Sequence, residues 1–122
     1  MNWYERNPER LAVELKLISQ FHPRSQVVKQ GGLLRIRRAI RGRMAIYSTE
    51  VIYPVDFPFG IATAIILAPK LRSSPHQFAE QRLCICHAED VSLETTGKVY
   101  CDWVDQWIER YERFCESGDW ND

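Results

Sequence analysis

The chain has 122 residues, of which 45% are apolar and 26% are charged, and its formal net charge is zero. A chain of this size and composition forms one hydrophobic core, so we expect a single globular domain over residues 1–122. No apolar run approaches membrane-spanning length and no apolar leader follows Met1, so we expect a cytoplasmic protein without a secretory signal or membrane contact.

The first predicted element is a helix that begins near Pro8. Asn7 is a capping residue, proline suits the first helical position, and Glu9 adds an acidic side chain to the first turn. Apolar residues then recur at helical spacing, and they are Leu11, Leu15 and Ile18, with Val13, Leu17 and Phe21 widening the stripe. The pattern predicts an amphipathic helix that ends at residues 22–23, where a proline follows a histidine.

Four strands are predicted next, in the order of an antiparallel meander. They cover residues 26–29, 33–40, 44–53 and 61–68. Glycines at the first two connections indicate turns, and the second strand alternates apolar residues with arginines, as in a strand with one buried face. After Pro69 the pattern becomes irregular up to residues 83–86, Leu-Cys-Ile-Cys.

The last predicted element is a helix over residues 98–117. One face of it carries an apolar stripe formed by Val104, Trp107, Ile108, Tyr111, Phe114 and Cys115. Glu109 and Arg113 have the spacing of an ion pair, and Gly118 stands where a C-terminal cap belongs. The predicted fold class is therefore α+β: an N-terminal helix, a four-stranded meander, an irregular segment and a C-terminal helix.

Several short motifs, taken in their order, resemble those of the ubiquitin-conjugating enzymes. Residues 53–59, Tyr-Pro-Val-Asp-Phe-Pro-Phe, are similar to the proline-containing segment after the third strand of that family. His76, followed by Leu-Cys-Ile at residues 83–85, is similar to the family's active-site segment. Residues 103–120 are similar to the tail of bacterial conjugating-enzyme-like proteins. The resemblance extends over residues 7–120 and points to the stand-alone proteins of short type II CBASS antiphage operons.

The resemblance implies a ubiquitin-conjugating-enzyme-like fold and a thioester chemistry. Cys84 would carry the C-terminal carboxyl group of a partner protein, and His76 would brace the active-site loop by hydrogen bonding. The implied partner is a cGAS-like nucleotidyltransferase (CD-NTase) that presents its C-terminal tail. No metal or organic cofactor is implied, and because the sequence has no glycine-rich phosphate loop, we expect the carboxyl group to arrive already activated.

Three departures from the family pattern bear on this expectation. Phe78 replaces the asparagine that helps to stabilise the oxyanion during transfer to an amine. The loop between His76 and Cys84 is shorter than usual, and Gly-Ile-Ala at residues 60–62 replaces a proline pair. Thioester formation is compatible with these losses, whereas efficient transfer to lysine is not expected. The alternative is a non-catalytic adaptor of the same fold, in which Cys84 is incidental.

The four cysteines all fall in the last third of the chain, which favours reduced thiols over a disulfide framework. A thiolate is a good nucleophile near neutral pH, and Cys84 is the first candidate acyl acceptor, although it also has the character of a small buried apolar residue. Cys101 is the second candidate: Asp102 would raise the pKa of its thiol, and the nearby helix N-terminus would lower it. Cys86 and Cys115 are expected to serve packing.

A zinc site formed by Cys84, Cys86, His87 and His76 is a further possibility that the residue types raise. Structural zinc takes four nitrogen or sulfur ligands in tetrahedral geometry, and Cys-x-Cys-His is not a usual ligand spacing. We therefore predict no metal site.

Charge is distributed unevenly along the chain. Residues 1–61 contain ten Lys/Arg and five Asp/Glu, and residues 62–122 contain six and eleven. Five arginines gather around the second strand, namely Arg35, Arg37, Arg38, Arg41 and Arg43. Because no aromatic platform interleaves with them, we expect a solvated face or a surface for an acidic partner protein, and no nucleic-acid binding.

Overall fold

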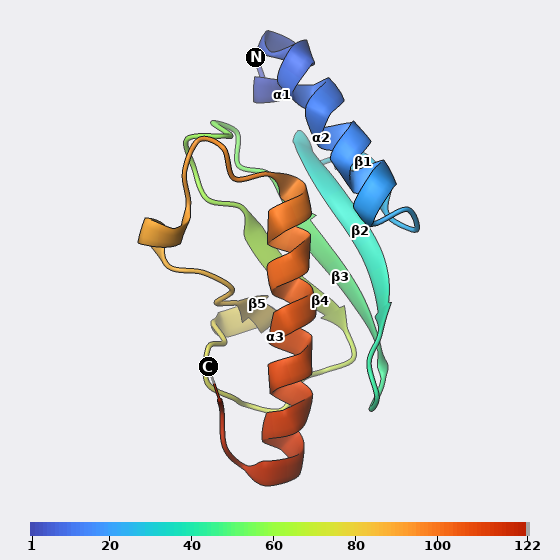
Figure 1. Ribbon diagram of the computed structural model, residues 1–122, viewed down its shortest axis with the longest axis vertical. Helices are drawn as coiled ribbons and strands as arrows, with labels where there is room; N and C mark the ends of the chain where they lie inside the picture. The colour runs from blue at the N-terminus through green and yellow to red at the C-terminus, as the bar shows by residue number, and fades with distance from the viewer. Residues whose placement is uncertain (122) are drawn as a thin grey trace.

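The computed structural model describes residues 1–121, in which two N-terminal helices, a five-stranded antiparallel sheet and a long C-terminal helix are present (Figure 1). In chain order the elements are α1 (Trp3–Arg6), α2 (Pro8–Phe21), β1 (Gln26–Gln30), β2 (Leu33–Arg41), β3 (Ile46–Ile52), β4 (Thr63–Ala68), η1 (Ala79–Gln81), β5 (Arg82–Leu83), η2 (Ala88–Asp90) and α3 (Gly97–Ser117). This is the predicted α+β class, and it is compatible with a ubiquitin-conjugating-enzyme-like fold. Within residues 1–121, no helix combines the length and the apolar character needed to cross a membrane.

Helix α2 begins where the sequence predicts. The Asn7 side chain accepts a hydrogen bond from the Arg10 amide at 3.0 Å, and Pro8 takes the first helical position. Of the apolar stripe on this helix, Ile18 is fully buried, whereas Val13, Leu15 and Phe21 are all exposed. The other buried residue of α2 is polar: Glu14, which is 0% exposed.

Glu14 joins α2 to two distant parts of the chain. Its carboxylate accepts hydrogen bonds from the Tyr53 hydroxyl at 2.6 Å and from the Gly97 amide at 2.6 Å. Arg10 binds the other carboxylate oxygen at 3.1 Å and donates to the carbonyls of Leu93 and Thr95. A buried carboxylate is tolerated when it is paired and hydrogen-bonded in this way. These contacts fix the N-terminal end of α3.

The sheet has the order β1-β2-β3-β4-β5, with all neighbours antiparallel, so the predicted meander is confirmed. The short strand β5 joins it at the edge, where Ala64 pairs with Leu83. A two-residue strand is too short for apolar alternation to reveal it in the sequence. At the opposite edge, the pairing between β1 and β2 ends at Gln26↔Arg37, whereas β2 stays paired with β3 as far as Arg41↔Ile46.

Helix α3 covers one face of the sheet (Figure 1). The Thr96 side chain caps its first turn, and Gly118 ends it in a left-handed conformation with φ of 81°. Its predicted stripe is confirmed for Val104, Trp107, Ile108 and Tyr111, which are buried. The last two members, Phe114 and Cys115, are half-buried. The buried members pack on the inward side chains of the strands, including Ile36, Tyr47, Val51, Ala64 and Ile66.

A second buried carboxylate connects α3 to the turn between β2 and β3. Glu112 accepts hydrogen bonds from the amides of Arg43 at 2.9 Å and Met44 at 2.8 Å, and from the Tyr47 hydroxyl at 3.0 Å. Burial opposes ionisation of Glu112, but the hydrogen bonds from Met44, Arg43 and Tyr47 outweigh it and lower the pKa of this carboxyl group. Gly42 has to be glycine, because a Cβ atom there would collide with this carboxylate.

Candidate functional site

Cys84 follows directly after β5 and is half-buried. Its amide donates to the His76 carbonyl at 3.0 Å, and the Phe78 amide donates to the Arg82 carbonyl at 2.8 Å. Between them, Gln77 forms a bridge with Leu83. Residues 76–78 thus run alongside residues 82–84, and η1 closes the small hairpin that they form. Cys84 is thus held beside the edge strand of the sheet.

The hairpin contains three non-glycine residues in the left-handed region. The φ angles are 58° at His76, 62° at Glu80 and 59° at Gln81. Such conformations are unfavourable for residues with a Cβ atom, and they persist where surrounding contacts determine them. They concentrate in the eight residues before Cys84.

Gln81 supplies those surrounding contacts. Its side-chain oxygen accepts from the Leu71 amide at 2.6 Å, and its side-chain nitrogen donates to the carbonyls of Ile66 at 2.9 Å and Pro69 at 3.1 Å. The hairpin is therefore tied to the end of β4. No pattern in the sequence separates Gln81 from other glutamines, so its role was not predicted.

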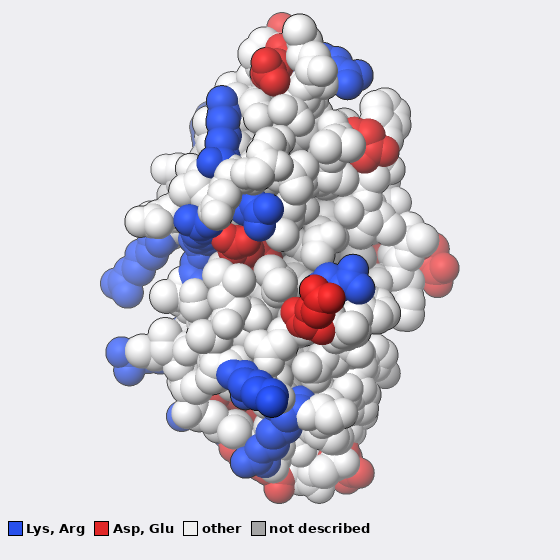
Figure 2. Space-filling view, turned by 180° about the vertical axis from the view of Figure 1, so that it is seen from behind, with Lys and Arg blue, Asp and Glu red and all other residues white. Residues whose placement is uncertain are grey.

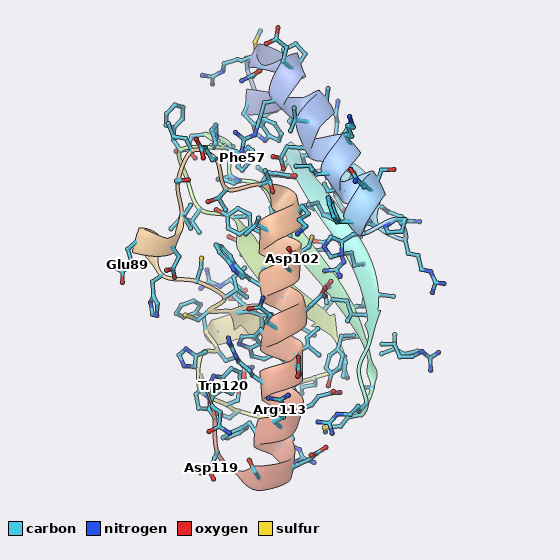
Figure 3. All side chains as sticks on the ribbon, viewed as in Figure 1. Phe57, Glu89, Asp102, Arg113, Asp119 and Trp120 are labelled. Carbon is cyan, nitrogen blue, oxygen red and sulfur yellow. The ribbon has the colours of Figure 1, made fainter. Side chains whose placement is uncertain are left out.

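His76 was expected to brace the loop, and its backbone carbonyl makes two bracing contacts. This carbonyl accepts the Cys84 amide and also the Trp107 indole N–H at 2.9 Å. The ring centroids of His76 and Trp120 are 5.3 Å apart. The C-terminal segment that contains Trp120 folds back against α3 (Figure 3). Trp107, expected only to pack, therefore connects α3 directly to the backbone beside Cys84.

Cys84 borders two hollows on the surface. One, of about 310 Å³, is lined by His76, Cys84, Ile85, Cys86, His87, Asp90, Trp103, Trp107, Arg110 and Trp120. The other, of about 250 Å³, includes Phe78, Ile61, Ile85 and Cys84 in its lining. The first is polar and aromatic and the second is largely apolar, so a chain arriving at Cys84 meets a different surface on each side. Arg110, which brings a cation to the first hollow, was not predicted.

The other thiols differ in burial: Cys101 is buried, whereas Cys86 and Cys115 are half-buried like Cys84, and Cys86 lines the same two hollows. Cys101 is 0% exposed, and burial raises the pKa of its thiol to about 12, despite the nearby Arg38 guanidinium. Burial, followed by Asp90 and Cys84, also raises the pKa of the Cys86 thiol. Cys115 is half-buried and packs against the core, as expected. A buried thiol with a raised pKa is a poor nucleophile at neutral pH, and this favours Cys84 over Cys101 as acyl acceptor.

The four residues considered for zinc all line the larger hollow. Among residues 1–121, a group of three ligand atoms within 4.8 Å of one another is found elsewhere, at His22, Asp102 and Asp105. These carboxylates already pair with cations: Asp102 with Lys98 at 2.5 Å and Asp105 with Arg38 at 2.7 Å. The group is therefore an ion-pair network between the end of α2 and α3.

A protein-family model described as Type II CBASS E2 protein matches residues 14–122 of the chain. The matched stretch begins inside α2 and includes the sheet, the hairpin before Cys84 and α3. No curated protein and no solved structure matches the chain.

Proposed function

The chain belongs to the family of Type II CBASS E2 proteins, and from this premise we propose that it carries the C-terminal carboxyl group of a partner protein as a thioester on Cys84. The proposed partner is a cGAS-like nucleotidyltransferase, and the proposed setting is antiphage defence. The observation that carries the assignment to Cys84 is its position directly after β5, where the His76 carbonyl fixes its amide and its half-buried thiol lies at the rim of two hollows. Cys86 lines the same two hollows, but burial, followed by Asp90 and Cys84, raises the pKa of its thiol.

The proposed reaction is an acyl transfer. The Cys84 thiolate attacks the carbonyl carbon of an activated carboxyl group, either an acyl adenylate or an existing thioester. A carbon–sulfur bond forms, and the adenylate or the departing thiolate leaves. The contribution of this chain is positional, because the hydrogen bonds from Cys84 and Trp107 to the His76 carbonyl hold the nucleophile's backbone in place.

Co-expression with a cGAS-like nucleotidyltransferase tests the proposal. We expect a covalent adduct on a non-reducing gel that disappears with thiol reductant. The Cys84→Ala variant should form none, and Cys84→Ser should give an adduct that resists reductant, because an oxyester replaces the thioester. Cys101→Ala is the matched control and should form the adduct as the wild type does. An adduct that survives Cys84→Ala but is lost in Cys101→Ala would instead assign the acceptor to Cys101.

A second candidate function is a non-catalytic adaptor, and Phe78 favours it. This side chain offers no hydrogen-bond donor, although it lines the same hollow as Cys84. An adaptor would bind the nucleotidyltransferase without a covalent link. Co-purification that persists unchanged in Cys84→Ala, with no adduct in the wild type, would support the adaptor and contradict the thioester.

A further inference from the structure

The edge of the sheet formed by β2 is open beyond the end of β1. Within residues 1–121, residues 38–41 pair with β3 on one side and with no strand on the other. The Leu34 carbonyl accepts the Tyr53 amide, so even-numbered residues of β2 direct their backbone groups toward β3. Ala39 and Arg41 therefore direct their amides and carbonyls away from the sheet. In Figure 1 this part of β2 forms the margin of the molecule, below α2.

This open edge is held firmly in place. The turn that follows β2 is fixed by Glu112, through the amides of Arg43 and Met44. The Arg38 guanidinium donates to the Cys101 carbonyl at 3.2 Å and to Asp105 at 2.7 Å, which ties the strand to α3. A rigid edge loses little conformational freedom when another strand pairs with it.

Two hollows flank the same residues. One, of about 350 Å³, has Phe21, Arg38, Ala39 and Ile40 in its lining, and the other, of about 330 Å³, has Arg37, Arg38 and Ala39. Arg24 lines both. Alternate side chains of an added strand would point into these two hollows, because successive side chains of a strand point to opposite faces.

The charge around the edge is positive in part, because Arg35 and Arg37 pair with Glu50, and Arg43 pairs with Glu116. Residues 21–43 contain seven Lys/Arg and no Asp/Glu. Figure 2 shows Lys and Arg side chains gathered along the side of the molecule where β1 and β2 lie. Within residues 1–121, neither Arg24 nor Arg41 has a carboxylate within ion-pair distance, whereas Arg38 is neutralised by Asp105.

We propose that the open edge of β2 docks an extended acidic segment of a partner protein, which adds as a strand beside Ala39 and Arg41. The exposed amides and carbonyls would give the backbone pairing, and Arg24 and Arg41 would bind the carboxylates. A peptide fits better than a nucleic acid, because pairing with a strand edge requires alternating backbone donors and acceptors. This site is separate from Cys84, so it stands whether or not Cys84 carries a thioester.

Ala39→Pro is the variant that tests strand addition. Its N–H points away from β3, so proline removes the outward donor and keeps the β2–β3 ladder intact. The matched control is Ala39→Val, which keeps the donor and suits a strand. The probe is a fluorescein-labelled, end-capped ten-residue peptide of alternating threonine and glutamate, followed by fluorescence anisotropy at low salt.

We expect the wild type and Ala39→Val to bind the peptide, and Ala39→Pro to bind at least about tenfold more weakly, which corresponds to about 1.4 kcal/mol. The same peptide with backbone N-methyl groups on the pairing side should also bind weakly to the wild type, so the test does not depend on the folding of Ala39→Pro. Replacing glutamate by lysine in the peptide, or introducing Arg24→Glu with Arg41→Glu, should abolish binding.

Three results would overturn the proposal. Equal binding of the N-methylated and unmodified peptides would mean that the backbone edge is not used. Displacement of the peptide by an oligodeoxynucleotide that binds more tightly would identify a nucleic-acid surface. Concentration-dependent dimerisation that Ala39→Pro abolishes, with no peptide binding, would mean that the edge pairs with a second copy of the chain.

Discussion

Phe78 stands where the family resemblance expects an asparagine, and its side chain is 56% exposed. In an enzyme that depends on such a donor, its loss costs about 10²–10³ in rate. We therefore predict that a Cys84 thioester decays slowly when millimolar lysine is added, and that Phe78→Asn accelerates this decay. The measurement is single-turnover decay of purified conjugate with and without lysine.

Phe78→Leu is the matched control for this prediction, because it removes the ring without adding a donor. It should leave the lysine-dependent decay as slow as in the wild type. Rapid lysine-dependent decay of the wild-type conjugate would refute the idea and would require another donor near Cys84. An equal acceleration by Phe78→Leu and Phe78→Asn would indicate that the ring acts by steric exclusion.

Single residues were predicted well from the sequence where the signal is local. The cap at Asn7 and the left-handed Gly118 depend on a few neighbouring residues, and both are present. Glu14 could not be predicted in the same way, because its partners Tyr53 and Gly97 lie 39 and 83 positions away. The two hydrogen bonds to the His76 carbonyl depend on the folded hairpin, so no local pattern in the sequence could indicate them.

Among the elements, the contact between α3 and the β2–β3 turn depends most on one side chain. Glu112 accepts three hydrogen bonds there, from the Arg43 and Met44 amides in the turn and from the Tyr47 hydroxyl on β3. Glutamine has one oxygen acceptor and would place an NH₂ group against a donor. Hydrogen bonds to a charged group contribute about 1.5–3 kcal/mol, so we predict that Glu112→Gln lowers the free energy of unfolding by about 2 kcal/mol or more. Urea denaturation of the wild type and of Glu112→Gln at neutral pH measures this difference in the free energy of unfolding.

Glu116→Gln provides the matched control on the same helix. Glu116 pairs with Arg43 at 3.2 Å, and both side chains are more than half exposed, 55% and 61%. Exposed pairs contribute about 0–1 kcal/mol, so this variant should unfold nearly as the wild type does. A loss of stability as large as that of Glu112→Gln would mean that the effect comes from helix charge and not from the buried contact.

The sequence predicted the longer helices and strands correctly, because a hydrophobic period becomes visible only over several residues. The N-terminal helix, the four strands and the C-terminal helix each contain enough residues for a period to show. Helix α1, residues Trp3–Arg6, and strand β5 are too short for that, and neither was predicted. Of these two short elements, β5 is the one that affects the site, because Cys84 follows it directly. It pairs with β4 only after the intervening residues 69–81 have reversed the direction of the chain.

Two of the buried carboxylates hold the molecule together in different ways, one between the sheet and α3 and one between two strands of the sheet. Glu112 connects the β2–β3 turn to α3, and Glu50 on β3 pairs with Arg35 at 2.9 Å and Arg37 at 2.5 Å on β2. Burial opposes ionisation of Glu50, but the hydrogen bonds from Arg37 and Arg35 outweigh it, so the pKa of this carboxyl group is lowered from its ordinary value of 4.5. The pKa of Glu112 is lowered in the same sense. Both groups therefore favour the folded state in their ionised form.

The pH dependence of stability follows from this direction. When the pH falls below 4.5, the unfolded chain takes up protons on these carboxylates before the folded chain does. Their stabilisation is therefore complete above that pH and is lost as the pH falls through the lowered values of the folded state. We predict that the urea midpoint stays nearly constant from pH 7 to 5 and then decreases steadily down to pH 3.

The double variant Glu50→Gln, Glu112→Gln should be less stable at pH 7 and should show a shallower decrease below pH 4.5 than the wild type. A decrease that begins near pH 6.5 would instead assign the transition to histidine, and an equally steep decrease in the double variant would assign it to the other carboxylates.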